Sequence, residues 1–119
     1  MSPSTQVSQF DTSRWEKSLE EEYARREGDR LQLLRHAEAT LPVYFADKRV
    51  GAVYLTGSLL REGQFRDFSD VDIAVEGLGE NYFEVLVQLE DLLDRQVDLI
   101  ELEGSRLVET IRQHSRRVI

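Results

Sequence analysis

Two aspartates, Asp70 and Asp72, lie on either side of Val71 in a short segment that alternates acidic and apolar residues. This alternation is typical of a β-strand, in which residues two apart share a face, so the two Cα atoms would lie about 6–7 Å apart. Two carboxylates at that distance repel each other unless a cation compensates them. Carboxylate oxygens favour Mg²⁺ or Mn²⁺. The pair therefore predicts a divalent-metal site, and the alternative is a strand whose outer face is simply solvated.

A third aspartate, Asp98, opens the next apolar segment at residues 97–102. If this segment is the neighbouring strand, about 5 Å separates it from the Asp70–Asp72 segment. Three carboxylates on adjacent strands can hold two metal ions, an arrangement that stabilises the attacking and the leaving oxygen of an in-line displacement at phosphorus. The alternative is an ordinary edge strand with Asp98 at its solvated end.

A glycine-serine pair, Gly57 and Ser58, follows an apolar segment at residues 50–55. Glycine lets the backbone approach a ligand closely. A serine hydroxyl and free backbone amides are good donors to phosphate oxygens where a helix begins. Arg61 follows one turn later, where it could make a charge-assisted contact with a phosphate. The segment predicts a phosphate-binding turn, although a lone Gly-Ser pair is more often only a turn.

A small sheet and several helices are needed to position these residues. The apolar segments at 50–55, 71–75 and 97–102 predict three strands. Apolar residues at helical spacing predict helices over residues 14–40, 81–94 and 105–114. Gly28 is a candidate break in the first helix, and Pro42 fits the first turn of a further short helix that ends near Asp47. The order of elements predicts an α+β fold, an α/β sandwich in which helices cover one face of a small mixed β-sheet.

The first predicted helix carries apolar residues in a stripe: Trp15, Leu19 and Tyr23, and then Leu31, Leu34, Ala37 and Leu41. A stripe of this kind is usually a packing face. We therefore expect these residues to belong to the core, with docking of a partner as the alternative.

The chain has 119 residues and a net charge of −8, and residues 67–103 hold twelve acidic side chains but one basic side chain. Such an acidic surface disfavours direct nucleic-acid binding. The absence of cysteine excludes a disulfide scaffold and a cysteine-based zinc site. No apolar run is long enough to span a membrane, and the first residues lack the pattern of a secretory signal. We therefore expect a cytoplasmic protein. His36 and His114 are expected to be surface groups.

Taken together, Gly57-Ser58, Asp70-x-Asp72 and Asp98 resemble the nucleotidyltransferases of the DNA polymerase beta superfamily. The strings YLTGSLLREG, SDVDIAVEGL and VDLIELE are similar to its minimal nucleotidyltransferase (MNT) branch over about residues 43–119. The resemblance implies the DNA polymerase beta-like fold for that region, and we expect the whole chain, residues 1–119, to form a single minimal domain. Its parts would be a flexible segment at 1–12, N-terminal helices at 13–48 and a catalytic core at 49–119.

The resemblance also implies a role for each site residue. Gly57 and Ser58 would hold the triphosphate of ATP, and Asp70 and Asp72 would ligate two Mg²⁺ ions. Asp98 would complete the second metal site and help to deprotonate the attacking hydroxyl. Arg61 matches an arginine that often follows the Gly-Ser pair. One residue more than is common in the family separates Ser58 from Asp70, with Glu62 between Arg61 and Gly63, and this leaves the role of Arg61 open.

Members of the MNT branch act as antitoxins beside HEPN-domain ribonuclease toxins and transfer AMP from ATP to a tyrosine of the toxin. The resemblance implies the same reaction here, with ATP as substrate, two Mg²⁺ ions (Mn²⁺ as a substitute) and a HEPN-family toxin as partner. The alternatives are an antitoxin that acts by binding alone and a nucleotidyltransferase for a small molecule of the antibiotic type. Near the C-terminus, Arg112, Arg116 and Arg117 could contact the triphosphate or complement the dipole of the last helix.

Overall fold

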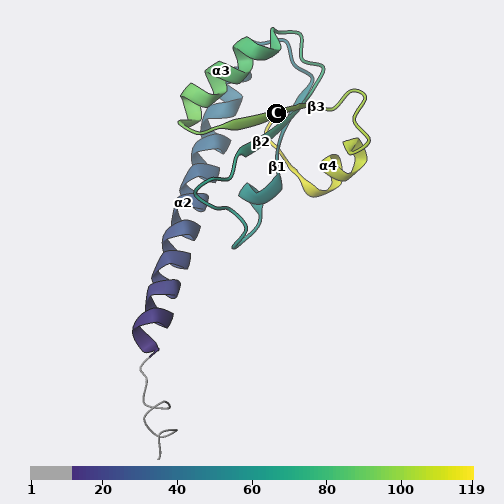
Figure 1. Cartoon of the computed structure of the whole chain (residues 1–119). Coiled ribbons are helices and arrows are strands. Elements are labelled where there is room, and N and C mark those ends of the chain that lie inside the picture. Colours follow the sequence, from purple (N-terminus) through teal and green to yellow (C-terminus); the bar gives the residue numbers. More distant parts are fainter. Residues whose placement is uncertain (1–11) are drawn as a thin grey trace, which may run out of the picture.

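The computed structural model describes residues 12–119 (Figure 1). The expected flexible segment at residues 1–12 lies, apart from Thr12, outside the described residues. The elements are α2 (Ser13–Phe45), β1 (Ala52–Thr56), the 3-10 turn η1 (Gly57–Leu60), β2 (Val71–Glu76), α3 (Tyr82–Leu93), β3 (Val97–Glu101), α4 (Val108–His114) and β4 (Arg116–Arg117). The three predicted strands are confirmed, and the short strand β4 is an element that the sequence did not predict.

The four strands form one mixed sheet in the order β3-β2-β1-β4. Strands β2 and β3 are parallel, whereas β1 is antiparallel to both β2 and β4. The parallel pair is possible because α3 carries the chain from the end of β2 back to the start of β3. The predicted small mixed sheet in an α+β fold is therefore confirmed.

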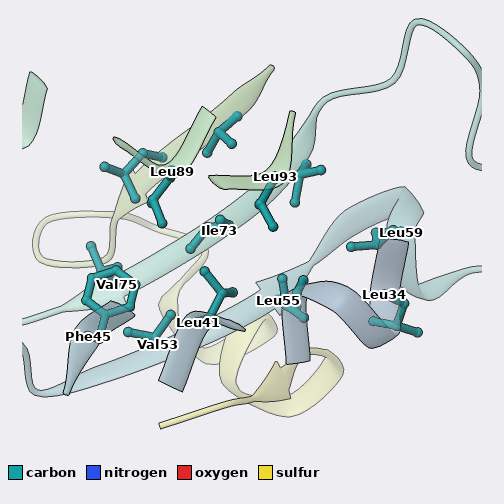
Figure 2. Packing of buried hydrophobic residues seen from close by; sticks show 14 of the residues in the cluster. Leu34, Leu41, Phe45, Val53, Leu55, Leu59, Ile73, Val75, Leu89 and Leu93 are labelled. Carbon is teal, nitrogen blue, oxygen red and sulfur yellow. The ribbon is translucent and has the colours of Figure 1, made fainter. Parts of the chain in front are cut away.

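Helices α2 and α3 cover one face of this sheet (Figure 2). Leu55 of β1 and Ile73 of β2 are completely buried there, together with Leu41 of α2 and Leu89 of α3. Each such side chain contributes about 1.5–3 kcal/mol through the loss of its contact with water. The alternating residues of β2 thus fix which face of the strand turns toward the helices and, with it, which face carries Asp72.

The opposite face of the sheet is partly covered as well, which corrects the prediction of helices on one face alone. Ala52, Tyr54 and Ala74 are buried there in a second cluster with Leu102 and Ile111, and Ile111 belongs to α4. Alternation along β1 and β2 turns these smaller or amphipathic side chains away from the main core, so α4 can pack on them. On β2 the cluster ends at Ala74. The end of this face that carries the aspartates stays open.

Helix α2 runs without interruption through Gly28, where the sequence suggested a break. A single glycine lowers helix stability by only about 1 kcal/mol relative to alanine. Two ion pairs span it, from Arg25 to Asp29 at 3.0 Å and from Arg30 to Glu27 at 2.9 Å. These pairs join residues three and four apart, which are neighbours on a helix surface and support it locally.

The predicted new helix at Pro42 is also wrong, since Pro42 lies inside the last turns of α2. Proline removes one backbone donor from a helix. Leu41 and Phe45 on either side of it are buried against the sheet, so tertiary packing holds these turns in place. None of the helices described here combines the length and the apolar character needed to cross a membrane.

The N-terminal half of α2 extends beyond the sheet (Figure 1). Trp15, Leu19 and Tyr23 are 66%, 46% and 41% exposed, so their expected role in the core is wrong for this chain. Leu31 is exposed as well, whereas the later members of the stripe, Leu34, Ala37 and Leu41, are buried as predicted. The difference arises because the sheet lies opposite only the second half of the helix.

Candidate active site

The candidate site lies where β2 begins, on the face of the sheet that α4 leaves open. The register of the parallel pair places Asp72 directly beside Asp98, and the antiparallel pair places Thr56 on the other side of Asp72. Asp70 immediately precedes β2 and is exposed, as is Asp98, while Asp72 is half-buried. The structure therefore brings Asp72 and Asp98 to adjacent positions on neighbouring strands, as the spacing predicted.

The three carboxylates influence one another. Burial raises the pKa of Asp72 above its usual range, and the charges of Asp98 and Asp70 raise it further. Within residues 12–119 none of the three carboxylates is hydrogen-bonded or ion-paired. As the side chains stand in this part of the chain, no three acidic or histidine groups are close enough to hold a metal ion. Metal binding would therefore require the exposed Asp70 and Asp98 side chains to turn toward Asp72, a rotamer change that exposed side chains make within nanoseconds.

Gly57 lies against the central aspartate. Its φ is +76°, and a Cβ atom built there would be 2.1 Å from Oδ2 of Asp72. Only glycine adopts this conformation readily, and only glycine leaves room for the carboxylate. The sequence predicted that Gly57 allows close approach of a ligand, and the structure adds Asp72 as a neighbour that requires it.

Ser58 and Arg61 belong to the turn that follows. Ser58 is half-buried in η1, whose next residue, Leu59, is buried in the core. The backbone amide of Arg61 donates to the backbone oxygen of Ser58 at 3.1 Å, and the Arg61 side chain is exposed. Glu62 lies in the Ser58–Asp70 segment, which is one residue longer than is common in the family. Glu62 accepts a hydrogen bond from the Tyr23 hydroxyl at 3.0 Å. The longer loop is thus tied to α2 while Arg61 stays beside the turn.

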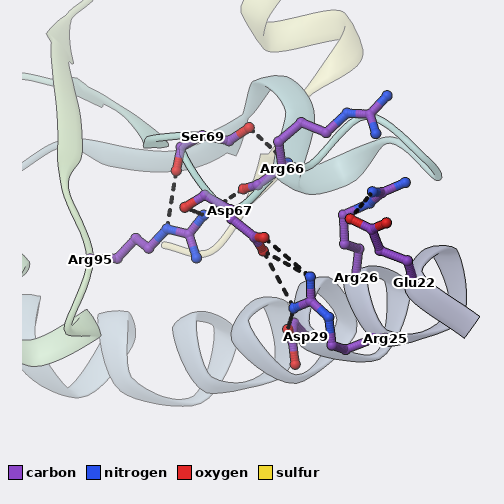
Figure 3. Close-up of polar contacts among 8 residues, drawn as sticks. All are labelled: Glu22, Arg25, Arg26, Asp29, Arg66, Asp67, Ser69 and Arg95. Atoms are coloured by element: carbon purple, nitrogen blue, oxygen red, sulfur yellow. Dashed lines mark hydrogen bonds and ion pairs between the residues drawn. The ribbon is translucent and has the colours of Figure 1, made fainter.

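Arg95, two residues before β3, fixes the backbone immediately before Asp70 (Figure 3). Its Nε donates to the backbone oxygen of Ser69 at 3.1 Å. Its Nη2 donates to the backbone oxygens of Arg66 and Asp67 at 2.6 and 3.0 Å. Sequence reasoning missed this residue, because nothing in the pattern around a lone arginine reveals which carbonyl groups it meets.

Helix α2 contacts the same loop through Arg25, which the sequence also did not single out. Arg25 forms an ion pair with Asp67 at 3.1 Å (Figure 3). The hydrogen bond and charge of Arg25 lower the pKa of Asp67 below its usual range. Both side chains are largely exposed, so solvent screening leaves this pair with little effect on stability. It orients the loop more than it stabilises the fold.

Two of the three C-terminal arginines are engaged in ion pairs. Arg112 pairs with Glu76, at the far end of β2 from Asp72, at 2.6 Å, and Arg116 pairs with Glu38 of α2. Arg117 lies opposite Tyr54 in the β1–β4 pair. Because paired residues and residues two apart share a face, Arg117 is on the same face as Asp72. A triphosphate contact stays a prediction for this one arginine. His36 and His114 are exposed, as predicted.

Residues 39–119 match the family described as Polymerase beta, Nucleotidyltransferase. No curated protein matches the chain in sequence at a significant level. Similar solved structures include a chain from the toxin–antitoxin with AMP-PNP (24% identity, TM-score 0.56, covering 69% of this chain and 72% of that chain). A chain from a mutant MntA toxin–antitoxin is similar over the same shares of both chains (22% identity, TM-score 0.56). A chain from the toxin–antitoxin MntA-HepT is 22% identical with a TM-score of 0.50, covering 69% of this chain and 68% of that chain.

These identities below 25% show a shared fold. The family match carries the assignment, since it spans more than half of the chain and contains the glycine-serine turn and all three aspartates. The chain therefore belongs to the Polymerase beta nucleotidyltransferase family.

Proposed function

We propose that this protein is an antitoxin nucleotidyltransferase that transfers AMP from ATP to a tyrosine of a HEPN-type ribonuclease toxin. The observation that carries the proposal is the placement of Asp72 between Gly57 and Asp98 in a chain of the nucleotidyltransferase family. The similar solved structures support the toxin–antitoxin context, and one of them is described with AMP-PNP. Another is a mutant in which two aspartates, two positions apart, are replaced by glutamate. That spacing is the spacing of Asp70 and Asp72.

The donor set fits Mg²⁺ or Mn²⁺. All three candidate ligands are carboxylates, the oxygen donors that these ions prefer. Burial first, and then the charges of Asp98 and Asp70, raise the pKa of Asp72, and a bound divalent cation would offset both effects. Asp70 and Asp72 would hold both ions, and Asp98 would hold the second. Bound Mg²⁺ supplies charge neutralisation on the triphosphate and on the departing pyrophosphate.

The residues of this chain would bind and orient the two reactants. Ser58 and the free amides of its turn would donate to the triphosphate oxygens, and Arg61 would add a charge-assisted contact. An ordinary tyrosine has a pKa of about 10, so its hydroxyl needs a base. Asp98, which is exposed on the edge strand β3, would accept that proton from the partner's tyrosine. The tyrosine oxygen forms a bond to the α-phosphorus while the bond from that phosphorus to pyrophosphate breaks.

The surroundings of the site favour a protein over a small molecule as the acceptor. Within the described residues, the hollow that Asp70 lines has a volume of about 170 Å³, and Asp72 and Asp98 do not line it. Pockets for small-molecule ligands usually enclose about 300–1,000 Å³. A larger hollow of about 490 Å³ lies between α2 and the end of α3, where it is lined by His36 and Leu92 rather than by the aspartates. The second half of the acceptor site is therefore expected to come from the partner.

The reaction is tested by incubating the purified protein with ATP, Mg²⁺ and the cognate toxin. The toxin is expected to gain the mass of one or more AMP units, and replacement of its acceptor tyrosine by phenylalanine is expected to prevent the gain. Omission of Mg²⁺ serves as the matched control. A toxin that is neutralised without any gain in mass would support the binding-only alternative. Growth of an expressing strain on an antibiotic panel would support the small-molecule alternative.

The exposed stripe of Trp15, Leu19 and Tyr23 supports the same partner. A ribonuclease needs a basic surface to bind RNA. Residues 13–24, which carry the stripe, hold four acidic side chains (Glu16, Glu20, Glu21 and Glu22) and two basic ones (Arg14 and Lys17), so this part of the helix is net acidic. An apolar stripe on a net acidic segment is complementary to an apolar patch on a basic surface. We place the toxin, rather than a second copy of this chain, on this part of α2.

Combined replacement of Trp15 and Leu19 by alanine is expected to weaken toxin binding by at least about tenfold, because tryptophan anchors commonly contribute 2 kcal/mol or more. Isothermal titration against the toxin measures the effect. Phe83→Ala is the matched control, since Phe83 is equally exposed but lies on α3. Unchanged toxin affinity would remove the stripe from the interface. Self-association of the wild type that disappears in the variant would assign the stripe to a second copy.

A further inference from the structure

Arg30 on α2 is the one polar or charged side chain that is buried within residues 12–119, with 7% exposure. Its Nη1 donates to the backbone oxygen of Leu59 at 3.0 Å, in the same turn η1 that carries Ser58. Its Nε and Nη2 donate to the two carboxylate oxygens of Glu27 at 2.9 and 3.1 Å. The guanidinium therefore joins the helix to the phosphate-binding turn through three directed hydrogen bonds.

Glu27 extends this contact to the far end of the loop. Its Oε2 accepts a hydrogen bond from the backbone amide of Gly63 at 3.2 Å. The hydrogen bond from Arg30 lowers the pKa of Glu27 below its usual range, so Glu27 is ionised at neutral pH. One turn earlier on α2, the Tyr23 ring lies under Gly63, where an added Cβ would meet it at 3.4 Å. Helix α2 thus holds residues 57–63 near both ends.

The loop needs such support because of its backbone. Gly57 and Gly63 at its two ends have φ values of +76° and +74°. Glycine at these positions allows the required conformation but leaves many others open. A largely buried ion pair adds little net stability, since desolvation offsets much of its attraction. The pair of Glu27 and Arg30 instead fixes the orientation of the groups that it contacts, because a guanidinium fork fixes the geometry of its hydrogen-bond partners.

We propose that Glu27 and Arg30 are positioning residues that hold residues 57–63 in the conformation that receives the triphosphate. This inference rests on the proposed function, and it places part of the site's support in α2, outside the residues 39–119 that match the family. A loop that is already ordered loses less conformational entropy when the nucleotide binds. The pair therefore strengthens nucleotide binding and leaves the chemical step itself almost unchanged.

The test uses Mg²⁺ with AMP-PNP as the probe and compares Arg30→Met, Arg30→Lys and the control Arg26→Met with the wild type. Arg26 pairs with Glu22 on the same helix at 3.2 Å, so the control removes an equal charge one turn away. Arg30→Met is expected to weaken binding about tenfold, the equivalent of one charged hydrogen bond. Arg30→Lys keeps the charge without the fork and is expected to lie in between. Amide exchange of Gly63, measured by NMR without nucleotide, is expected to accelerate in both Arg30 variants and not in Arg26→Met.

In transfer assays, KM for ATP is expected to rise in Arg30→Met while kcat stays within about threefold of the wild type, a change that a general loss of stability would not produce. If Arg30→Met does not fold, Arg30→Lys carries the comparison. Equal probe affinity in the wild type and the Arg30 variants overturns this inference alone, as does unchanged exchange of Gly63. Absence of probe binding by the wild type overturns the proposed function and this inference with it.

Discussion

Replacement of Asp72 by asparagine is expected to abolish most AMP transfer while leaving the metal-free protein at least as stable as the wild type. Asp72 lies between Asp98 and Gly57, so its carboxylate is the central one of the three candidate metal ligands. Loss of one preorganised electrostatic group typically lowers the rate by about 10²–10³-fold. The rate is measured as AMP incorporated into the toxin at saturating ATP and Mg²⁺.

Although this substitution lowers activity, it is expected not to lower the stability of the metal-free protein. This expectation follows from the pKa of Asp72. Burial, followed by the charges of Asp98 and Asp70, raises the pKa of Asp72 in the folded protein. The folded state then holds this proton more tightly than the unfolded state, so stability decreases as the pH rises from the unfolded to the folded pKa. Above the folded pKa the full penalty is present. Asparagine removes the charge and, with it, the penalty.

Thermal unfolding in EDTA at neutral pH is therefore expected to give Asp72→Asn a Tm equal to or above that of the wild type. Addition of Mg²⁺ is expected to raise the Tm of the wild type and not that of the variant, because only the wild type gains binding free energy. Asp91→Asn, at an exposed position of α3, controls for the change in net charge. Transfer that survives in Asp72→Asn, or a Tm well below that of the wild type, would contradict the assigned role.

Replacement of Gly57 by alanine is expected to disable the same site through the backbone. Alanine at a φ of +76° is strained by roughly 1–2 kcal/mol. Its Cβ would also lie 2.1 Å from Oδ2 of Asp72, so the carboxylate or the turn must move. A displacement of about 1 Å at a reacting centre can lower the rate about 10²-fold. Both Tm and AMP transfer are expected to fall.

Gly104 offers a matched control for this experiment. Its φ is +81°, and an added Cβ would have no neighbour within 4 Å. Gly104→Ala therefore introduces the same kind of backbone strain without the collision. The expected pattern is a loss of Tm in both variants that is larger in Gly57→Ala, with transfer lost in Gly57→Ala alone. If both variants transferred AMP at the same rate, the close approach of Gly57 to Asp72 would have no catalytic consequence.

The sequence by itself determined the elements of the sheet and the candidate chemistry. Alternation along residues 71–75 put Asp72 on the face opposite Ile73, and the structure has it there. The position of Asp98 at the start of the next strand predicted its place beside Asp72, and the β2–β3 register confirms that place. These features could be predicted because they depend on the period of a strand and on a connection of ordinary length, both of which are local properties.

Only the tertiary structure decided how α2 is used. Its apolar residues have the same helical spacing throughout, yet Leu41 is buried and Trp15 is exposed, because the sheet lies opposite only one half of the helix. Likewise, no pattern in the sequence connects Arg30 with Leu59 or Arg95 with Ser69. These contacts join residues that are 29 and 26 positions apart. Periodicity reports which face a residue lies on, whereas the fold alone decides what stands opposite that face.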